Sequence, residues 1–190
     1  MLTNLYFVRH AHSIYTADEL NRPLSEHGQE GARKVAKALK NENVNVFISS
    51  PYKRAIQTIE GLAEIMSADI LIEKDFRERL LSGKPIDDFE TAIAKVWEDF
   101  SFKWEGGESS NAAQNRGVRA LEKTLQRFAG ENIVVGTHGN LMALIMNSFD
   151  RKFDFAFWRQ LDMPDIYKLS FDYLKLTGVK RIHMPIEEEA

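Results

Sequence analysis

The sequence predicts a three-layer α/β/α sandwich with a mainly parallel β-sheet. Short apolar runs, typical of buried strands, alternate along the chain with longer segments whose apolar residues recur at helical spacing. The chain shows no internal repeat and no low-complexity linker, and its 190 residues are ample for one hydrophobic core. A single domain over residues 1–190 is therefore the simplest organisation.

The first half of the chain alternates strands with helices. Ser25 is a plausible N-cap for a helix whose apolar face is formed by residues 32–39. Ser50 and Pro51 predict the start of the next helix, with Ser50 before it and Pro51 in its first position. The predicted strands are three short apolar runs: residues 5–8, 44–48 and 70–72.

The second half begins with a less regular stretch, residues 74–110, which we expect to be an insertion or a lid over the functional site. It holds one predicted helix around residues 89–100 and then an aromatic, glycine-containing loop. An acidic tail, residues 187–189, ends the chain. The remaining predicted elements are helices at 118–128 and 141–149, a buried strand at 133–135, and antiparallel strands around 166–173 and 179–184.

The composition excludes several classes of protein. The net charge of -3 argues against a general nucleic-acid-binding surface. The absence of cysteine excludes disulfides, thiolate metal sites and a cysteine nucleophile. No signal peptide is evident, and no apolar run approaches the roughly 20 residues that span a bilayer. We therefore expect a cytoplasmic protein without a membrane or nucleic-acid partner.

Polar residues follow three of the predicted strands. Arg9 and His10 end the first strand, the second leads to Arg54, and His138 follows the strand at residues 133–135. Ligands of open α/β sheets bind beyond the carboxyl ends of the strands. If these strands are neighbours, two histidines and two arginines converge at one edge of the sheet. The alternative is that each is an isolated polar residue at a strand end.

These residue types suit the transfer of a phosphoryl group. The guanidinium groups of Arg9 and Arg54 can bind phosphate oxygens bidentately without a metal, and Arg54 lies in the first turn of its helix, where an anion is favoured. A neutral His10 can attack phosphorus, and His138 can donate to a phosphoryl oxygen. The small side chains of Ala11 and Gly139 leave room beside the two histidines.

The leaving alkoxide needs a proton donor, and Glu78 is the strongest candidate. Beside a phosphate dianion, the pKa of a glutamate is expected to rise, which would let Glu78 act first as an acid and then as the base that activates water. The alternative is a solvated run of charges over residues 73–79, which the residues alone favour.

Several segments, in order along most of the chain, resemble the histidine phosphatase superfamily, which includes the cofactor-dependent phosphoglycerate mutases. The run Val8-Arg9-His10-Ala11 resembles the family's opening Arg-His-Gly signature. The other segments that carry the likeness are Pro23-Leu24-Ser25-Glu26-His27-Gly28, residues 49–58 with Arg54, Gly107-Glu108-Ser109 with Arg116, and Gly136-Thr137-His138-Gly139.

The resemblance implies a phosphoglycerate mutase-like fold and a phosphohistidine intermediate on His10. It also implies a phosphate pocket of Arg9, Arg54, His10 and His138, with Glu78 as the proton donor. The chain departs from the family pattern at three places, where Ala11 replaces a glycine, His12-Ser13 replaces Glu-Ser or Glu-Thr, and Thr16 replaces an asparagine. These changes bear on the inner phosphate contacts of the mutases.

The leading hypothesis is a metal-independent phosphomonoesterase that acts on a small phosphorylated substrate and needs no cofactor. A phosphoglycerate mutase is the second hypothesis, although the chain is short for that role. A phosphate-recognising interaction module with little turnover is the third, but a binding module needs no nucleophile. A metal-dependent hydrolase is disfavoured because the acidic pair Asp87-Asp88 has no nearby histidine in the sequence.

Overall fold

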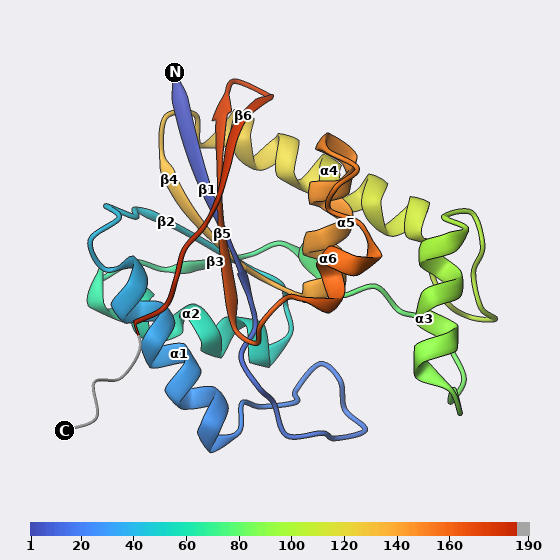
Figure 1. The fold of residues 1–190 in the computed structure, drawn as a ribbon. Coiled ribbons are helices and arrows are strands. Elements are labelled where there is room, and N and C mark those ends of the chain that lie inside the picture. The colour runs from blue at the N-terminus through green and yellow to red at the C-terminus, as the bar shows by residue number, and fades with distance from the viewer. Residues whose placement is uncertain (186–190) are drawn as a thin grey trace.

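The computed structural model describes residues 1–185, so the acidic tail at 187–189 lies outside the described residues. Its centre is a six-stranded sheet flanked by helices, which confirms the predicted α/β sandwich (Figure 1). The strand order is β3-β2-β4-β1-β5-β6. The strands are β1 (Leu2–Arg9), β2 (Val46–Ser49), β3 (Ile70–Ile72), β4 (Asn132–Thr137), β5 (Asp165–Asp172) and β6 (Lys175–Arg181).

Helices pack on both faces of the sheet (Figure 1). Helices α1 and α2 share one hydrophobic core with the sheet, and α4 and α5 share the other. The helices are α1 (Glu26–Leu39), α2 (Lys53–Ile65), α3 (Phe89–Glu98), α4 (Ser110–Arg127), α5 (Gly139–Phe149) and α6 (Phe155–Arg159), with a 3₁₀ helix η1 (Lys74–Phe76).

The apolar run of β1 is continuous because successive side chains enter the cores on opposite faces of the sheet. Leu5 and Phe7 point into the core that contains α4 and α5, whereas Tyr6 and Val8 point into the core that contains α1 and α2. All four side chains are fully buried, as expected for a strand covered by helices on both faces.

The register of the sheet brings three strand ends together. Strand β4 pairs in parallel with both β1 and β2. Just beyond the strands, the His10 N–H donates to the Thr137 carbonyl at 2.9 Å and the Ser50 N–H donates to the Gly136 carbonyl at 2.9 Å. The residues that follow β1, β2 and β4 therefore meet at one edge of the sheet. On the other side of β1, the sheet becomes antiparallel through β5 and β6.

Two helix starts differ from the sequence prediction. Helix α2 begins at Lys53 after the N-cap residue Tyr52, so Pro51 lies outside it. Ser50 is not its cap, and its hydroxyl contacts His138 and the Tyr52 N–H. Helix α4 begins at Ser110, well before the predicted residue 118, because Ser109 caps it and small or polar residues form its first turns.

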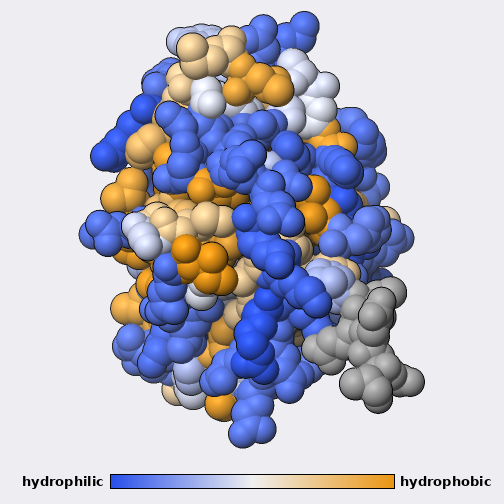
Figure 2. Space-filling model, turned by 90° about the vertical axis from the view of Figure 1, so that its left-hand side faces the viewer, coloured by the Kyte–Doolittle hydropathy of each residue, from blue (hydrophilic) through white to orange (hydrophobic). Residues whose placement is uncertain are grey.

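The less regular stretch at 74–110 contributes to the core as well as to the surface. Ile93 and Trp97 of α3 are buried, and the indole N–H of Trp104 donates to the Ala92 carbonyl at 3.1 Å. Its role as a lid stays a prediction. The face seen from the left of Figure 1 is largely hydrophilic, with apolar residues in separate patches (Figure 2). Among residues 1–185, no helix is both long and apolar enough to cross a membrane.

Candidate active site

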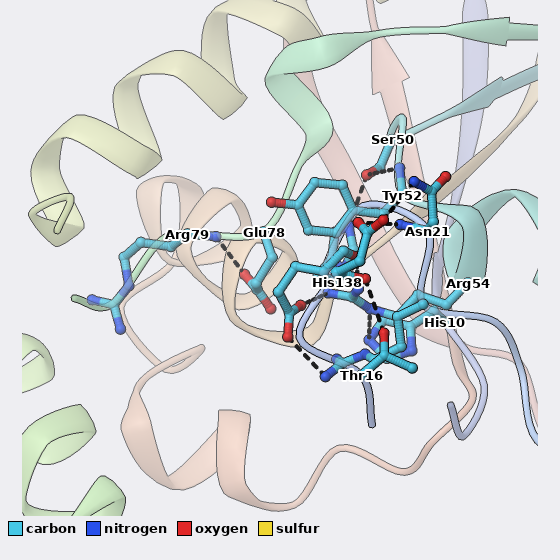
Figure 3. A network of polar contacts seen from close by, with 12 residues as sticks. His10, Thr16, Asn21, Ser50, Tyr52, Arg54, Glu78, Arg79 and His138 are labelled. Carbon is cyan, nitrogen blue, oxygen red and sulfur yellow. Dashed lines mark hydrogen bonds and ion pairs between the residues drawn. The ribbon is translucent and has the colours of Figure 1, made fainter. Parts of the chain in front are cut away.

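The ends of β1 and β4 bring the two predicted site histidines together. The ring centroids of His10 and His138 lie 5.2 Å apart, and both side chains are buried. Arg54, in the first turn of α2, donates from Nε to His10 Nε2 at 3.2 Å. Figure 3 shows these three side chains converging in one polar network.

The hydrogen bonds of His10 define its tautomer. Nδ1 lies 2.7 Å from the Ala11 carbonyl oxygen. A carbonyl can only accept, so Nδ1 carries the proton and Nε2 keeps its lone pair. Burial, with a smaller contribution from the positive charges of Arg54 and Arg9, lowers the pKa of His10 to about 3. The ring is therefore neutral at neutral pH, with an unprotonated nitrogen facing Arg54.

His138 is also neutral. Burial lowers its pKa well below the usual value, and the positive charge of Arg54 acts in the same direction. Its Nε2 is 2.8 Å from the Ser50 hydroxyl oxygen. The ring of Tyr52 packs edge-on against the imidazole, with centroids 5.0 Å apart, and lies under the Arg54 guanidinium. Ser50 is a site residue that the sequence analysis did not identify.

Arg9 ends β1 and reaches the loop that precedes β5. Its Nη1 donates to the carbonyls of Leu161 at 2.7 Å and Asp162 at 3.1 Å. A Cβ added at Gly139 would lie 2.8 Å from Arg9 Nε, so the missing side chain of Gly139 is what lets Arg9 pass beside the start of α5. Burial lowers the pKa of Arg9, and the negative charge of Glu78 opposes that shift.

The loop between β1 and α1 adds a third arginine and a carboxylate. Arg54 donates from Nη1 to the Glu19 carbonyl at 2.8 Å and pairs through Nη2 with the Glu19 carboxylate at 3.2 Å. Arg22 binds the other oxygen of that carboxylate at 2.9 Å. Burial lowers the pKa of Arg54, and the charge of Arg22 adds to that shift as it does, more weakly, for His10. The sequence did not identify Arg22 and Glu19 as site residues, because an irregular loop has no periodic pattern that shows where its side chains point.

Glu78 lies against the helix that follows His138. Its carboxylate accepts from the backbone N–H groups of Asn140 at 3.2 Å and Leu141 at 3.0 Å, in the first turn of α5. It also accepts from the N–H of Arg79 at 2.9 Å. The N-terminus of a helix favours a negative charge. Glu78 is thus held beside the histidines, whereas the buried Arg79 side chain points away from them (Figure 3).

A cleft of about 480 Å³ opens beside Glu78. Its lining residues include Tyr52, Glu78, Lys103, Gly107 and Glu108. A second cleft of about 550 Å³ lies between α1 and α2 and contains none of the converging side chains. Within residues 1–185, no group of three or more histidine, aspartate or glutamate side chains is arranged to hold a metal ion.

The remaining histidines, and the departures from the family pattern other than the buried Ala11, lie outside the group of converging side chains. His12 is exposed, with Nδ1 2.8 Å from the Ser25 hydroxyl. Thr16 donates to the Asp18 carbonyl at 3.0 Å. His27 and His183 are exposed. None of these side chains contacts His10 or His138 in a recorded hydrogen bond or ion pair of the described residues.

Comparisons with known proteins find relatives in sequence and in fold. The chain is 29% identical over 153 residues to phosphoserine phosphatase 1 of Hydrogenobacter thermophilus, covering 72% of this chain and 71% of the relative. A mycobacterial glucosyl-3-phosphoglycerate phosphatase shares the fold with a TM-score of 0.76 at 21% identity, covering 95% of this chain and 97% of the other. Phosphoglycerate mutase from Bacillus anthracis has a TM-score of 0.74 at 16% identity, with coverages of 95% and 92%.

The likeness extends through nearly the whole described chain. Residues 5–179 match the profile of the histidine phosphatase superfamily, branch 1. That range includes β1 with His10, α2 with Arg54, and the β4–α5 junction with His138. With a family match over most of its length and a sheet edge that unites these side chains, the chain belongs to the histidine phosphatase superfamily.

Proposed function

We propose that this protein is a metal-independent phosphomonoesterase that forms a covalent phosphohistidine on His10. The observation that carries the proposal is the state of His10, a neutral imidazole whose Nε2 lone pair faces the Arg54 guanidinium. A neutral imidazole is a competent nucleophile toward phosphorus. Arg9 and His138, from adjoining strand ends, complete the site that would receive the phosphate group.

The reaction takes two displacements. His10 Nε2 attacks phosphorus, the bond to the ester oxygen breaks, and Glu78 gives its proton to the departing alkoxide. Water then attacks the phosphohistidine, Glu78 accepts a proton from that water, and the P–N bond breaks to release inorganic phosphate and neutral His10. Arg9, Arg54 and His138 would stabilise the charge on the phosphoryl oxygens in both steps.

Buried donors without partners support an anionic ligand. Among the described residues, Arg9 Nε, Arg22 Nε and the His138 ring nitrogen Nδ1 are the buried site nitrogens that make no hydrogen bond, while Arg79 Nε and Trp97 Nε1 are unpaired elsewhere. Buried polar groups are nearly always hydrogen-bonded, since leaving one unpaired is costly. A phosphate dianion has oxygens enough to satisfy several donors together. This set of groups therefore fits a phosphate ester better than a neutral ligand.

The substrate class that we propose is a small phosphorylated metabolite. Two of the relatives are phosphatases named for phosphoserine and glucosyl-3-phosphoglycerate, which are small phosphate esters. The cleft beside Glu78 would hold the part of the substrate that leaves as the alcohol. A mutase would use the same pocket but would return the phosphoryl group from His10 to the substrate instead of passing it to water.

The decisive experiment is a panel of phosphomonoesters with detection of phosphohistidine after an alkaline, denaturing quench. Wild-type protein should release phosphate with chelator present and should accumulate acid-labile phosphate on His10. His10→Ala should lower turnover by roughly 10⁴-fold or more, since it removes the nucleophile. His12→Ala, which alters the exposed neighbouring histidine, should turn over normally.

Other outcomes would overturn the proposal. Interconversion of phosphoglycerates without net phosphate release would make the protein a mutase. Tight binding of monoesters without turnover would make it a phosphate-recognising module. Loss of activity in chelator, restored by a divalent metal, would contradict the metal-independent mechanism.

A further inference from the structure

The segment that carries Glu78 is held through its backbone carbonyl groups. Residues 75–78 run from η1 into the loop after it and belong to no strand or α-helix. Thr137 donates to the Phe76 carbonyl at 2.9 Å. Arg116 donates to the carbonyls of Asp75 at 2.7 Å, Arg77 at 3.0 Å and Glu78 at 3.4 Å. Each of these four consecutive carbonyl groups therefore accepts a hydrogen bond from a side chain of another element.

Arg116 is itself fixed in place. It projects from α4, and its exposed fraction is 4%. Its Nε and Nη2 donate to the two carboxylate oxygens of Glu108 at 2.7 and 2.8 Å. This bidentate pairing fixes the plane of the guanidinium group and compensates its buried charge. Glu108 is tied to the same region, because its N–H donates to the Leu80 carbonyl at 2.7 Å.

The two ends of Glu78 are therefore held by different elements. The carboxylate is held by the N-terminus of α5, and the main chain is held by Arg116 from α4. Within residues 1–185, no strand pairs with the segment to fix its path. A shift of the main chain would move the carboxyl group relative to the ester oxygen, and a misplacement of about 1 Å can cost about 10²-fold in rate.

We propose that Arg116, oriented by Glu108, is a positioning residue that sets the place of Glu78 for proton transfer. The inference rests on the proposed function, because it assigns to Arg116 a role in the step that Glu78 performs. Arg116 acts only through backbone carbonyls and touches no reacting atom. A lysine at this position would keep the charge but not the planar fork that spans three carbonyls and a carboxylate.

The test compares two esters that differ in their need for an acid. The leaving group of 4-nitrophenyl phosphate departs without protonation, whereas that of β-glycerol phosphate requires a proton. Arg116→Lys should lower kcat/KM for the glycerol ester by about 10- to 100-fold and for the aryl ester by less than about 3-fold. Arg119→Lys, an exposed position of the same helix, should change neither value.

A double variant separates positioning from general support of the fold. If Arg116 acts through Glu78, Arg116→Lys should not change the ratio of the two kcat/KM values further in a Glu78→Gln background. Glu108→Gln should shift the ratio in the same direction as Arg116→Lys, and it carries the test if the lysine variant does not fold. Equal losses for both esters, or a further change of the ratio in the Glu78→Gln background, would disprove the inference.

This design also separates two kinds of failure. If the wild-type protein hydrolyses neither ester, the proposed function fails. If the wild-type protein is active and both Arg116→Lys and Glu108→Gln keep the wild-type ratio of the kcat/KM values for the two esters, the positioning role alone fails.

Discussion

The two sides of the candidate site are built by different means. On the nucleophile side, His10 and His138 directly follow paired parallel strands, so the backbone hydrogen bonds of the sheet set their positions. On the side of the proposed acid, Glu78 lies on an irregular segment that the side chains of Arg116 and Thr137 hold in place. The positions of His10 and His138 therefore depend on the register of the sheet. The position of Glu78 depends on a few polar contacts that single substitutions can remove.

Substitutions on the two sides should also differ in which esters lose activity. Groups that bind the phosphoryl oxygens act on every phosphomonoester, because all share that part. A proton donor matters in proportion to the basicity of the leaving group. Variants of the nucleophile side should therefore reduce activity uniformly, and variants of the acid side should discriminate between esters.

After loss of His10 itself, Arg54→Lys should give the largest effect on the nucleophile side. Lysine cannot reproduce the contacts that the guanidinium makes at once with His10 and the neighbouring loop. We expect kcat/KM to fall by about 10³-fold, equally for aryl and alkyl esters. Steady-state kinetics on both esters measures this effect, and near-normal kinetics would remove Arg54 from the site.

Glu78→Gln should lower the activity toward the two esters by different amounts. The amide keeps the size of the side chain but cannot deliver a proton to the leaving group. We expect a loss of about 10²-fold for β-glycerol phosphate but only a few-fold loss for 4-nitrophenyl phosphate. Steady-state kinetics on the two esters measures both losses. Equal losses for the two esters would point to a different acid.

Gly139→Ala tests how closely Arg9 must pass the start of α5. The added Cβ would lie 2.8 Å from Arg9 Nε and would displace a guanidinium that the loop before β5 holds. We expect about a 10-fold loss of kcat/KM for both esters, since an oxygen-binding group is moved. Gly61→Ala is the matched control, because a Cβ there meets nothing within 4 Å. An unaffected Gly139→Ala variant would show that Arg9 does not need its present position.

The smallest effect concerns stability. Because the pKa of His10 is lowered to about 3 in the folded protein, the unfolded chain binds a proton between pH 6.5 and 3 that the folded chain does not. The free energy of unfolding should therefore fall as the pH is lowered through this window. Between pH 7 and 5.5, urea titrations should show a fall that is about 1 kcal/mol smaller in His10→Asn than in wild type. An equal fall in both proteins would contradict a neutral buried His10.

The sequence predicted the fold and the strand-end residues because those follow from local patterns. An apolar run such as residues 5–8 identifies a buried strand, and the residue after it must lie at the sheet edge. The loop carrying Glu19 and Arg22 has no such pattern, so their contacts with Arg54 required coordinates.

The start of α4 shows a second reason for missed features. Its first turns bury small residues and Arg116 instead of a stripe of large apolar side chains, so periodicity revealed only the later turns. The structure also placed Ser50 differently from its predicted role as a helix cap, because its hydroxyl contacts His138. Polar side chains with a tertiary partner override local capping preferences.

The hydrogen bond from His10 Nδ1 to the Ala11 carbonyl has a stereochemical consequence. It fixes the imidazole plane, so one nitrogen would present the phosphoryl group along one direction to both the departing alcohol and the incoming water. Each in-line displacement inverts the configuration at phosphorus, and two inversions restore it. An ester made chiral at phosphorus with oxygen isotopes and sulfur should thus yield thiophosphate of unchanged handedness, whereas direct attack by water would yield its mirror image.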